Sequence, residues 1–539
     1  MRIPPTESSI EPVTDAPSPP PRRSLPPDGP RSRRPTGDVE DDRPTGETPR
    51  VVDAPAVEEG SAATGVETPQ VSTRATTAHP ARRWVVLLAS FLAFMLTATA
   101  AVWQIAVRQG WSLPAGPSTV PASVFVTPSE PPSEPGTPPP DPSPTCVAAA
   151  LDAVPAQGVT GLTGQVIGLR SGAVLWSRAS DRLAIPASNQ KLLTALAVAE
   201  AAPDGLATVF KTSVVAGPGN QIVLVGGGDP YLASSIETAR LGQQQATLDE
   251  LAAQAAEVLK ARGQRSVRVG FDASLFTGPD WHSTWRPSYH TDVTAVSALW
   301  VDQGMTPTTP GGPPAARSAT PALDAARYFA SRLQGFGVTV TGVAAARAPA
   351  GASALTSVDS LPLRDIIAQT LLVSDNSAAE VLLRHLSRFT GGPGSFADGA
   401  RALTAWLKAH QLLAPGQVVV DGSGLSRSNL VPAATLAHAV VQAAASDGAS
   451  REILAGLPVS AATGTLLGRF QDRHVAGGRG WVHAKTGALV GVATMTGYTV
   501  TTSGQLLAFS LMINDNTKSL AAMRAWLDRL GAALTTAQC

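Results

Sequence analysis

The sequence has few cysteines, few lysines and no net charge. Its 539 residues include two cysteines and six lysines, and 41 basic side chains balance 41 acidic ones. A chain without excess positive charge lacks the basic surface that nucleic acids require, so no nucleic-acid partner is expected. The histidines and aspartates between residues 281 and 292 match no common zinc spacing. No metal is therefore expected, and nothing in the sequence implies another cofactor.

Proline is abundant, but it is concentrated in one part of the chain. Most of the 46 prolines lie before residue 146, and the chain is too long for one ordinary domain. Residues 1–83 mix proline, arginine and acidic residues without apolar periodicity. Such a segment cannot offset its chain entropy by burial, which predicts a disordered cytoplasmic tail. A docking role for its Pro-rich pieces is an open alternative, with the partner unknown.

Residues 84–107 form an uncharged apolar run of 24 residues. About 20 such residues span a bilayer as a helix, and Trp84 and Trp103 lie near its ends, as interface anchors do. The rival interpretation is a cleaved signal peptide, but signals have a shorter core close to the N-terminus. The run therefore predicts a single-pass anchor in the cell membrane, with Arg82 and Arg83 on the cytoplasmic side. Residues 108–145 then predict a Pro-rich linker on the cell-wall side.

The first motif that carries chemistry is Ser188-x-x-Lys191. Residues three apart share one face of a helix, and a hydroxyl at the N-terminal end of a helix lies where free N–H groups favour negative charge. A serine hydroxyl becomes a good nucleophile when a base takes its proton. A neutral lysine amine one turn away can be that base if burial or a second cation lowers its pKa from about 10.4 towards ~7–8.

Two later motifs complete the set. Ser374-Asp375-Asn376 follows a mostly apolar run, and Lys485-Thr486-Gly487 follows a segment that alternates like a strand. Each motif alone is a weak signal, because Ser-x-x-Lys is common on exposed helix faces. The ordered set is a strong signal, since two of the six lysines fall in it and the order matches the penicillin-recognising serine enzymes.

The ordered set resembles the D-alanyl-D-alanine carboxypeptidase/endopeptidase family, the class C low-molecular-mass penicillin-binding proteins, which are serine peptidases. The 186 residues from Ser188 to Ser374 leave room for the long insert of that family. The resemblance runs from about Cys146 to the C-terminus. It implies an α+β fold for residues 146–539, with a β-lactamase/transpeptidase-like antiparallel sheet flanked by helices, a helical lobe, and an inserted domain at about residues 206–314.

The resemblance also implies an activity and roles for the motif residues. It implies D,D-carboxypeptidase activity on peptidoglycan stem peptides through an acyl-serine, with β-lactams as acylating inhibitors and D,D-endopeptidase activity left open. Ser188 would be the nucleophile and Lys191 its base. Ser374 would pass a proton to the leaving nitrogen, and Lys485 would hold the local field. Asn376 would hold the substrate backbone and bond Lys191.

Further residues are implied to bind the substrate. Thr486 and Gly487 belong to the strand beside the substrate, and Thr486 would bind the terminal carboxylate. The N–H groups of Ser188 and Ala488 would form the oxyanion hole. Many relatives carry a hydroxyl residue where this chain has Ala488, so one carboxylate contact is expected to be missing. Arg427 is carried over as a substrate-facing residue, with a surface or structural arginine as the alternative.

Two other segments are predicted to have roles, one in substrate binding and one in helix capping. The segment from Trp281 to Asp292 is predicted to read the side chain of the stem peptide through Trp285 and Tyr289, because of its aromatic and polar mix and by analogy with the family. Ser377-x-x-Glu380 fits a capping box, which favours a structural over a catalytic role for the glutamate.

The two cysteines are Cys146 and Cys539. Both follow the predicted membrane segment, in a compartment that permits disulfides. In the fold that the resemblance implies, the first strand and the last helix pack on one sheet, so the two ends of the domain are neighbours. This predicts a Cys146–Cys539 disulfide, with two free thiols or a lipidated thiol as the alternatives.

Two other functions remain as alternatives. A serine β-lactamase of the same superfamily needs fast deacylation, and no convincing glutamate-bearing loop lies between Ser374 and Lys485. A catalytically degenerate scaffold protein is the second alternative, and the three intact motifs speak against it.

Overall fold

The computed structural model describes residues 139–539 except 240, 243, 307–315, 447, 538 and 539. The predicted tail, the predicted membrane helix at 84–107 and nearly all of the predicted linker lie outside these residues. Among the helices that the structure describes, none combines the length and the apolar character that crossing a membrane requires.

The first sheet is antiparallel and joins the beginning of the described chain to its end. Its five strands have the order β2-β1-β10-β9-β8. Their bounds are β1 (Leu162–Gly168), β2 (Val174–Arg178), β8 (Val482–Leu489), β9 (Val492–Val500) and β10 (Leu506–Asn514). All four strand pairs are antiparallel. The antiparallel sheet predicted from the sequence is therefore confirmed.

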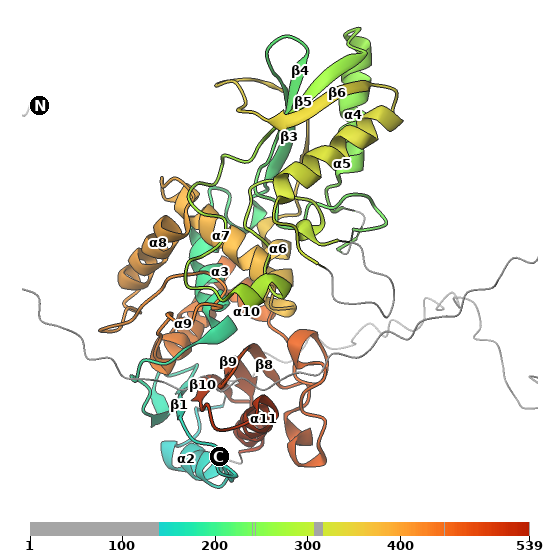
Figure 1. Ribbon diagram of the computed structural model, residues 1–539. Helices are drawn as coiled ribbons and strands as arrows, with labels where there is room; N and C mark the ends of the chain where they lie inside the picture. The colour runs from blue at the N-terminus through green and yellow to red at the C-terminus, as the bar shows by residue number, and fades with distance from the viewer. Residues whose placement is uncertain (1–138, 240, 243, 307–315, 447, 538–539) are drawn as a thin grey trace, which may run out of the picture. The chain divides into compact units, whose positions relative to one another are not determined.

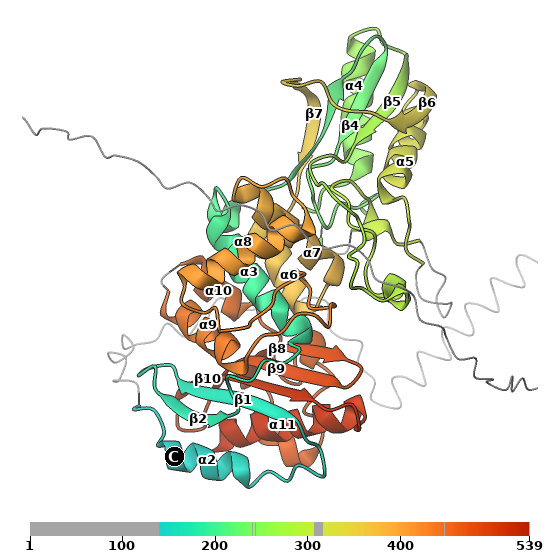
Figure 2. The same ribbon diagram turned by 60° about the vertical axis from the view of Figure 1, so that its left-hand side comes forward.

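Helices cover both faces of this sheet. Side chains alternate between the two faces of a strand, and in β10 Phe509 and Leu511 face one core while Ala508 and Met512 face the other. The first core is covered by α2 (Pro144–Asp152) and α11 (Leu520–Thr536), and the second by α9 (Ala433–Ala445). Figure 2 shows the sheet between these two helical layers.

The helical lobe is built around one buried helix, α3 (Gln190–Ala201). Every side chain from Gln190 to Ala199 is buried, as its almost continuous apolar sequence predicts. The helices packed around α3 are α6 (Leu363–Leu372), α7 (Asn376–Phe389), α8 (Phe396–Ala409), α9 and α10 (Ala449–Ala455). The Ser-x-x-Lys motif spans the start of α3 and the turn before it, so these helices fix the position of Lys191.

A second sheet forms an insert with its own core (Figure 1). Its strand order is β6-β5-β4-β3-β7, and β4, β5 and β6 run parallel. Parallel neighbours need long crossovers, which α4 and α5 supply. The bounds are β3 (Lys211–Ala216), β4 (Gln221–Val225), α4 (Leu248–Ala261), β5 (Ser266–Asp272), α5 (Pro321–Gly335), β6 (Thr339–Ala345) and β7 (Ala354–Asp359).

The predicted end of the insert near residue 314 was wrong. Strands β6 and β7 complete the second sheet, so the insert runs to Asp359. Helix α5 also packs in the core of the insert. Strand β6 carries small, mostly exposed side chains, so its sequence lacks the alternation of apolar and polar residues that would have predicted a strand.

Cys146 lies in the first turn of α2 and is bonded in a disulfide. Its predicted partner, Cys539, lies outside the described residues, so the pairing of these two residues stays a prediction. Helices α2 and α11 pack against each other, with Val147 and Leu151 buried in the same core as Leu530 and Leu534.

Candidate active site

The candidate nucleophile lies in a tight turn before α3. Ser188 is half-buried in a single 3-10 turn, Ala187–Asn189, and Ala187 has φ 47°, in the left-handed region. Gly424 lies against this turn with φ +80°, and a Cβ there would come within 1.8 Å of the Ala187 carbonyl oxygen. A Cβ on Gly487 would come within 3.0 Å of the Ala187 Cβ. Only glycine permits both approaches, so the turn is clamped from two sides.

Hydrogen bonds from the sheet hold the same turn. Thr494 Oγ1 on β9 donates to the Pro186 carbonyl oxygen at 2.9 Å, and Asn189 Nδ2 donates to Thr496 Oγ1 at 2.6 Å. These bonds attach the turn to the face of the sheet. The predicted position of Ser188, at the N-terminal end of the helix, is where the structure places it.

Lys191 joins three segments of the chain. Its Nζ donates to Ser188 Oγ at 3.0 Å, to Asn376 Oδ1 at 2.7 Å and to the Ser423 carbonyl oxygen at 2.7 Å. The side chain is 1% exposed. The structure therefore brings together the two residues of the first motif and the asparagine of the second.

Burial shifts the pKa of both motif lysines. Desolvation lowers the pKa of Lys191 to about 8, although the nearby carboxylates of Glu380, Asp421 and Asp375 oppose the shift. Lys485, which is fully buried, has its pKa lowered well below the usual value by desolvation and by the charge of Lys191. A lysine with a pKa near neutrality is suited to take a proton from a hydroxyl.

The second motif lies where α6 ends and α7 begins. Ser374 is half-buried with φ 62°, and the Asp375 carboxylate caps α7 by accepting from the Ala378 N–H at 3.0 Å. Asn376 is then the first helical residue. Its Nδ2 donates to the Asp292 carbonyl oxygen at 3.1 Å while its Oδ1 accepts from Lys191.

The predicted capping box was wrong. Because Asp375 caps the helix, Ser377 lies inside it, and its Oγ accepts from the Thr294 N–H at 3.1 Å. The Glu380 carboxylate makes no capping bond at the start of α7. It accepts from N–H groups of the loop at residues 421–429.

The third motif lies on β8, at the edge of the first sheet. Lys485 Nζ donates to the Thr486 carbonyl oxygen at 2.8 Å, and Thr486 Oγ1 donates to Thr465 Oγ1 at 2.8 Å. Gly487 lies against the nucleophile turn, and Ala488 is opposite Ala493 on β9.

The outer edge of β8 is only partly paired. The Ser460 N–H donates to the Val482 carbonyl oxygen, and the Ala484 N–H donates to the Pro458 carbonyl oxygen, each at 2.9 Å. Beyond Ala484, the described part of the chain supplies no strand on this side of β8. The edge from Lys485 to Leu489 can therefore receive an extended peptide as an added strand.

The sequence did not predict that two buried acids, Glu380 and Asp421, lie close enough to Lys191 to affect its pKa. Glu380 and Asp421 are both fully buried. Asp421 accepts from the Gly424 and Ser426 N–H groups at 2.9 and 2.6 Å, and Glu380 accepts from the Ser423 N–H at 2.7 Å. The signal available in the sequence was a glutamate among the apolar residues of α7, together with the polar run that follows Asp421.

Two residues predicted to face the substrate have contacts within the protein, and for Arg427 the substrate-facing role stays a prediction. Arg427 is half-exposed, and its Nη1 donates to the Val490 carbonyl oxygen at 2.8 Å, which ties the 421–429 loop to the β8–β9 turn. Trp285 is 4% exposed, and its Nε1 donates to Asp421 Oδ2 at 2.8 Å. The prediction that Trp285 reads a substrate side chain was therefore wrong. Tyr289 is half-buried in the same segment.

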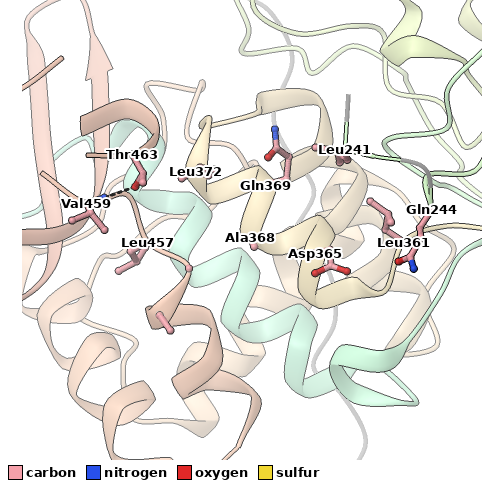
Figure 3. Close-up of a pocket in the computed structure, with 12 residues that line it drawn as sticks. Leu241, Gln244, Leu361, Asp365, Ala368, Gln369, Leu372, Leu457, Val459 and Thr463 are labelled. Atoms are coloured by element: carbon pink, nitrogen blue, oxygen red, sulfur yellow. Dashed lines mark hydrogen bonds between the residues drawn. The ribbon is translucent and has the colours of Figure 1, made fainter. Parts of the chain in front are cut away.

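A cavity of about 690 Å³ lies between α6 and the segment that follows α10 (Figure 3). One face of α6, including Ala368 and Leu372, lines it together with the segment after α10 that includes Thr463. Leu372 and Thr463 are two residues before Ser374 and Thr465, respectively. Through these two residues the cavity is close in sequence to the second motif and to Thr465, whose hydroxyl bonds Thr486.

No candidate metal site accompanies this cluster. Within the described ranges, no three histidine, cysteine, aspartate or glutamate side chains are grouped so that they could hold a metal ion.

Comparisons with known proteins agree with this architecture. The family model described as "D-Ala-D-Ala carboxypeptidase 3 (S13) family" matches residues 147–311 and 310–534. A carboxypeptidase of Mycobacterium tuberculosis is 36% identical over 384 residues, which are 68% of this chain and 80% of that protein. Carboxypeptidase DacB of Mycolicibacterium smegmatis is 33% identical over 402 residues, 73% of this chain and 84% of that one.

A solved structure has the same fold. The crystal structure of penicillin-binding protein 4 from Haemophilus influenzae superimposes with a TM-score of 0.60 at 20% sequence identity. The match covers 72% of this chain and 98% of that chain. A second structure of that protein, in complex with a β-lactam, gives a TM-score of 0.57 at 20% identity and the same 72% and 98% coverage.

Proposed function

The chain belongs to the D-Ala-D-Ala carboxypeptidase S13 family and is a serine-type D-Ala-D-Ala carboxypeptidase, and we propose that it acts on peptidoglycan stem peptides through an acyl-Ser188 intermediate. The observation that carries this proposal is the 3.0 Å contact between Lys191 Nζ and Ser188 Oγ in a buried network. We propose further that β-lactams acylate the same serine, as the β-lactam complex of the structural relative suggests.

The network supplies the proton transfers of the reaction. Lys191, as the free amine, takes the proton of Ser188 while Oγ attacks the carbonyl carbon between the two D-alanines. The C–N bond then breaks: Ser374 passes its hydroxyl proton to the leaving nitrogen and takes a proton in return from the Lys191 ammonium, which becomes a free amine again. Water hydrolyses the resulting ester, which releases the shortened peptide and restores the serine hydroxyl.

The substrate lies along the open edge of β8 in this proposal. An extended peptide that pairs with Lys485–Leu489 places its scissile carbonyl over Ser188, with the N–H groups of Ser188 and Ala488 as the oxyanion hole. Thr486 binds the terminal carboxylate, in the field of the buried Lys485. Asn376, already fixed by Lys191 and by the Asp292 carbonyl, holds the peptide from the other side.

Release of D-Ala from a stem pentapeptide is the direct test, together with covalent labelling by a fluorescent penicillin. A slowly decaying acyl-enzyme supports the carboxypeptidase, whereas fast loss of the label supports the alternative of a β-lactamase. A protein that neither releases D-Ala nor takes up the label contradicts the proposal and favours the degenerate scaffold.

The rate of penicillin acylation should depend on pH with a midpoint near 8. Only the neutral amine of Lys191 accepts the serine proton, and its pKa is lowered to about 8. The rate should rise roughly tenfold per pH unit below the pKa and level off above it. Stopped-flow labelling between pH 6 and 10 measures this profile. A rate that keeps rising to pH 10 would mean that Lys191 titrates like an ordinary lysine.

D,D-endopeptidase activity is a second candidate, and the cavity beside the site favours it. If Thr486 holds the carboxylate of the leaving residue, the leaving group lies on the side of Thr465, two residues after Thr463, which lines the cavity. A carboxypeptidase releases one small amino acid. Cleavage of a cross-link releases a whole second peptide, which needs such a space.

Filling the cavity should separate the two activities. Ala368→Trp places an indole in the cavity that Ala368 lines and replaces none of the motif residues. We expect cleavage of a cross-linked muropeptide dimer to fall about tenfold, or about 1.4 kcal/mol, while D-Ala release from a pentapeptide changes less than about twofold. Arg364→Trp, on the exposed side of the same helix, is the matched control. If Ala368→Trp lowers both activities equally, the cavity does not bind the leaving peptide.

Membrane anchoring belongs to the proposal as well. We propose that residues 84–107 hold the enzyme in the cell membrane with residues 146–539 on the cell-wall side. Release of the protein by detergent but not by high salt, and its loss from the membrane fraction when residues 1–107 are deleted, are the expected results.

A further inference from the structure

Glu380 is a buried acid for which the proposed reaction has no use. It lies in the middle of α7, is fully buried, and has apolar neighbours in sequence, Ala379 and Val381. Burying a carboxylate in such surroundings is costly unless it is fully hydrogen-bonded. The hydrogen bonds of the Glu380 carboxylate therefore indicate which part of the structure it stabilises.

The carboxylate binds the chain segment that contacts Lys191. Its two oxygens accept from the Gly422 N–H, each at 3.1 Å, and Oε1 also accepts from the Ser423 N–H at 2.7 Å. The carbonyl oxygen of the same Ser423 accepts from Lys191 Nζ at 2.7 Å. One residue thus connects the buried acid to the amine beside Ser188.

We propose that Glu380 is a positioning residue for the acyl-transfer reaction: it fixes the Gly422–Ser423 backbone so that the Ser423 carbonyl holds Lys191 Nζ against Ser188 Oγ. This inference rests on the proposed role of Lys191 as the base. It assigns to Glu380 no contact with the substrate, and no transfer of the reacting proton.

A carboxylate suits this task better than an amide. Three N–H···O contacts reach the two oxygens, and a carboxylate has acceptor sites for all of them. A glutamine would offer one oxygen and one NH₂ group, and the NH₂ would meet a backbone N–H, donor against donor. The Gly422–Ser423 backbone would have to move, and with it the acceptor of Lys191.

The charged groups around Glu380 also couple it to the protonation of Lys191. It faces Lys191 on α3, Asp421 in the neighbouring loop and Arg384 one turn further along α7, while Asp375 and Lys485 act on Lys191 from the start of α7 and from β8. Burial and the Asp421 charge raise the pKa of Glu380, while the hydrogen bonds from Gly422 and Ser423 oppose the shift by stabilising the carboxylate. In return, the Glu380 carboxylate raises the pKa of Lys191, so its removal should lower that pKa.

The test compares three variants in penicillin acylation as a function of pH. Glu380→Gln should lower the maximal acylation rate about tenfold or more and move the midpoint of the pH profile to lower pH. Glu380→Asp keeps the charge but withdraws it by one methylene. It should lower the rate less and leave the midpoint in place.

Asp528→Asn is the control for a merely structural effect. Asp528 is 8% exposed and pairs with Arg469 at 2.6 Å on α11, in the other core of the protein. Its loss should lower the melting temperature without moving the pH midpoint. If Glu380→Gln behaves like this control, or acylates like the wild type, the inference is wrong. If Glu380→Gln does not fold, a wild-type rate in Glu380→Asp overturns it instead.

Failure of the inference is distinct from failure of the proposed function. Wild-type protein that penicillin does not label contradicts the serine-acylation mechanism itself. Wild-type protein with a normal profile, beside a Glu380→Gln variant with the same midpoint, contradicts only the role of Glu380.

Discussion

Ser188→Ala should abolish covalent labelling by penicillin and reduce D-Ala release by at least about 10⁴-fold, the scale on which serine hydrolases lose activity with their nucleophile. The hydroxyl is the only group in the motif that can form the acyl ester, and Lys191 Nζ lies 3.0 Å from it. Intact-mass measurement after incubation with penicillin reads the result directly.

The variant should keep its fold. Ser188 is half-buried, and the clamps on its turn come from Gly424, Gly487 and the bonds of Thr494 and Asn189, none of which uses the hydroxyl. A melting temperature near that of the wild type is the control. Labelling of the variant at wild-type stoichiometry would place the nucleophile elsewhere.

Lys191→Arg should be nearly as damaging, although it keeps the positive charge. Arginine cannot be deprotonated in proteins, so the variant has no base, and general-base catalysis contributes about 10²–10⁴-fold. The guanidinium must also fit a site that is 1% exposed and lined by three acceptors placed for one amine. We expect acylation by penicillin to slow by about 10³-fold or more.

Lys211→Arg provides the matched control for this substitution. Lys211 lies on β3 of the insert, half-exposed to solvent, in an ion pair with Asp359. Its replacement should leave acylation unchanged. If Lys191→Arg acylates at close to the wild-type rate, the amine has only an electrostatic role, and the predicted pH midpoint near 8 must have another source.

The motif residues could be located from the sequence because their chemistry is encoded locally. Ser188 and Lys191 are three residues apart on one helix, and Asn376 and Lys485 belong to short motifs whose order is informative. The structure brings Ser188, Lys191 and Asn376 into direct contact. The elements that carry them, α3, α7 and β8, follow from apolar and alternating patterns.

The long-range contacts that hold the motif residues in place could not be predicted in the same way. The carbonyl of Ser423 reaches Lys191 from 232 residues away along the chain, and a backbone acceptor has no signature in sequence. Glu380 fits the sequence pattern of a capping box, but Asp375 is the N-cap residue of α7, and Glu380 accepts a hydrogen bond from a loop that is distant in sequence. Arg427 and Trp285 likewise resembled binding residues, while long-range contacts use them to hold the loop at residues 421–429.

The two sheets differ in how well the sequence predicted them. The strands of the first sheet are long and buried, and those of the C-terminal hairpin follow one another directly. In the insert, β4, β5 and β6 pair in parallel across long crossovers, so neighbours in the sheet are far apart in sequence. Strand β6 also exposes most of its residues, which leaves little periodicity to detect.

The strand order of the first sheet has a consequence for folding. Leu162 on β1 pairs with Ile513 on β10, so the ends of this pairing are separated by 513 − 162 = 351 residues. Closing such a loop is an entropic cost that must be met before the contacts form, which makes folding slow. The nucleophile turn is synthesised about 300 residues before the strands that clamp it, β8 and β9, which lie close to the end of the chain. A growing chain therefore carries its Ser-x-x-Lys motif for hundreds of residues without a working site, and a chain that ends before β8 remains inert.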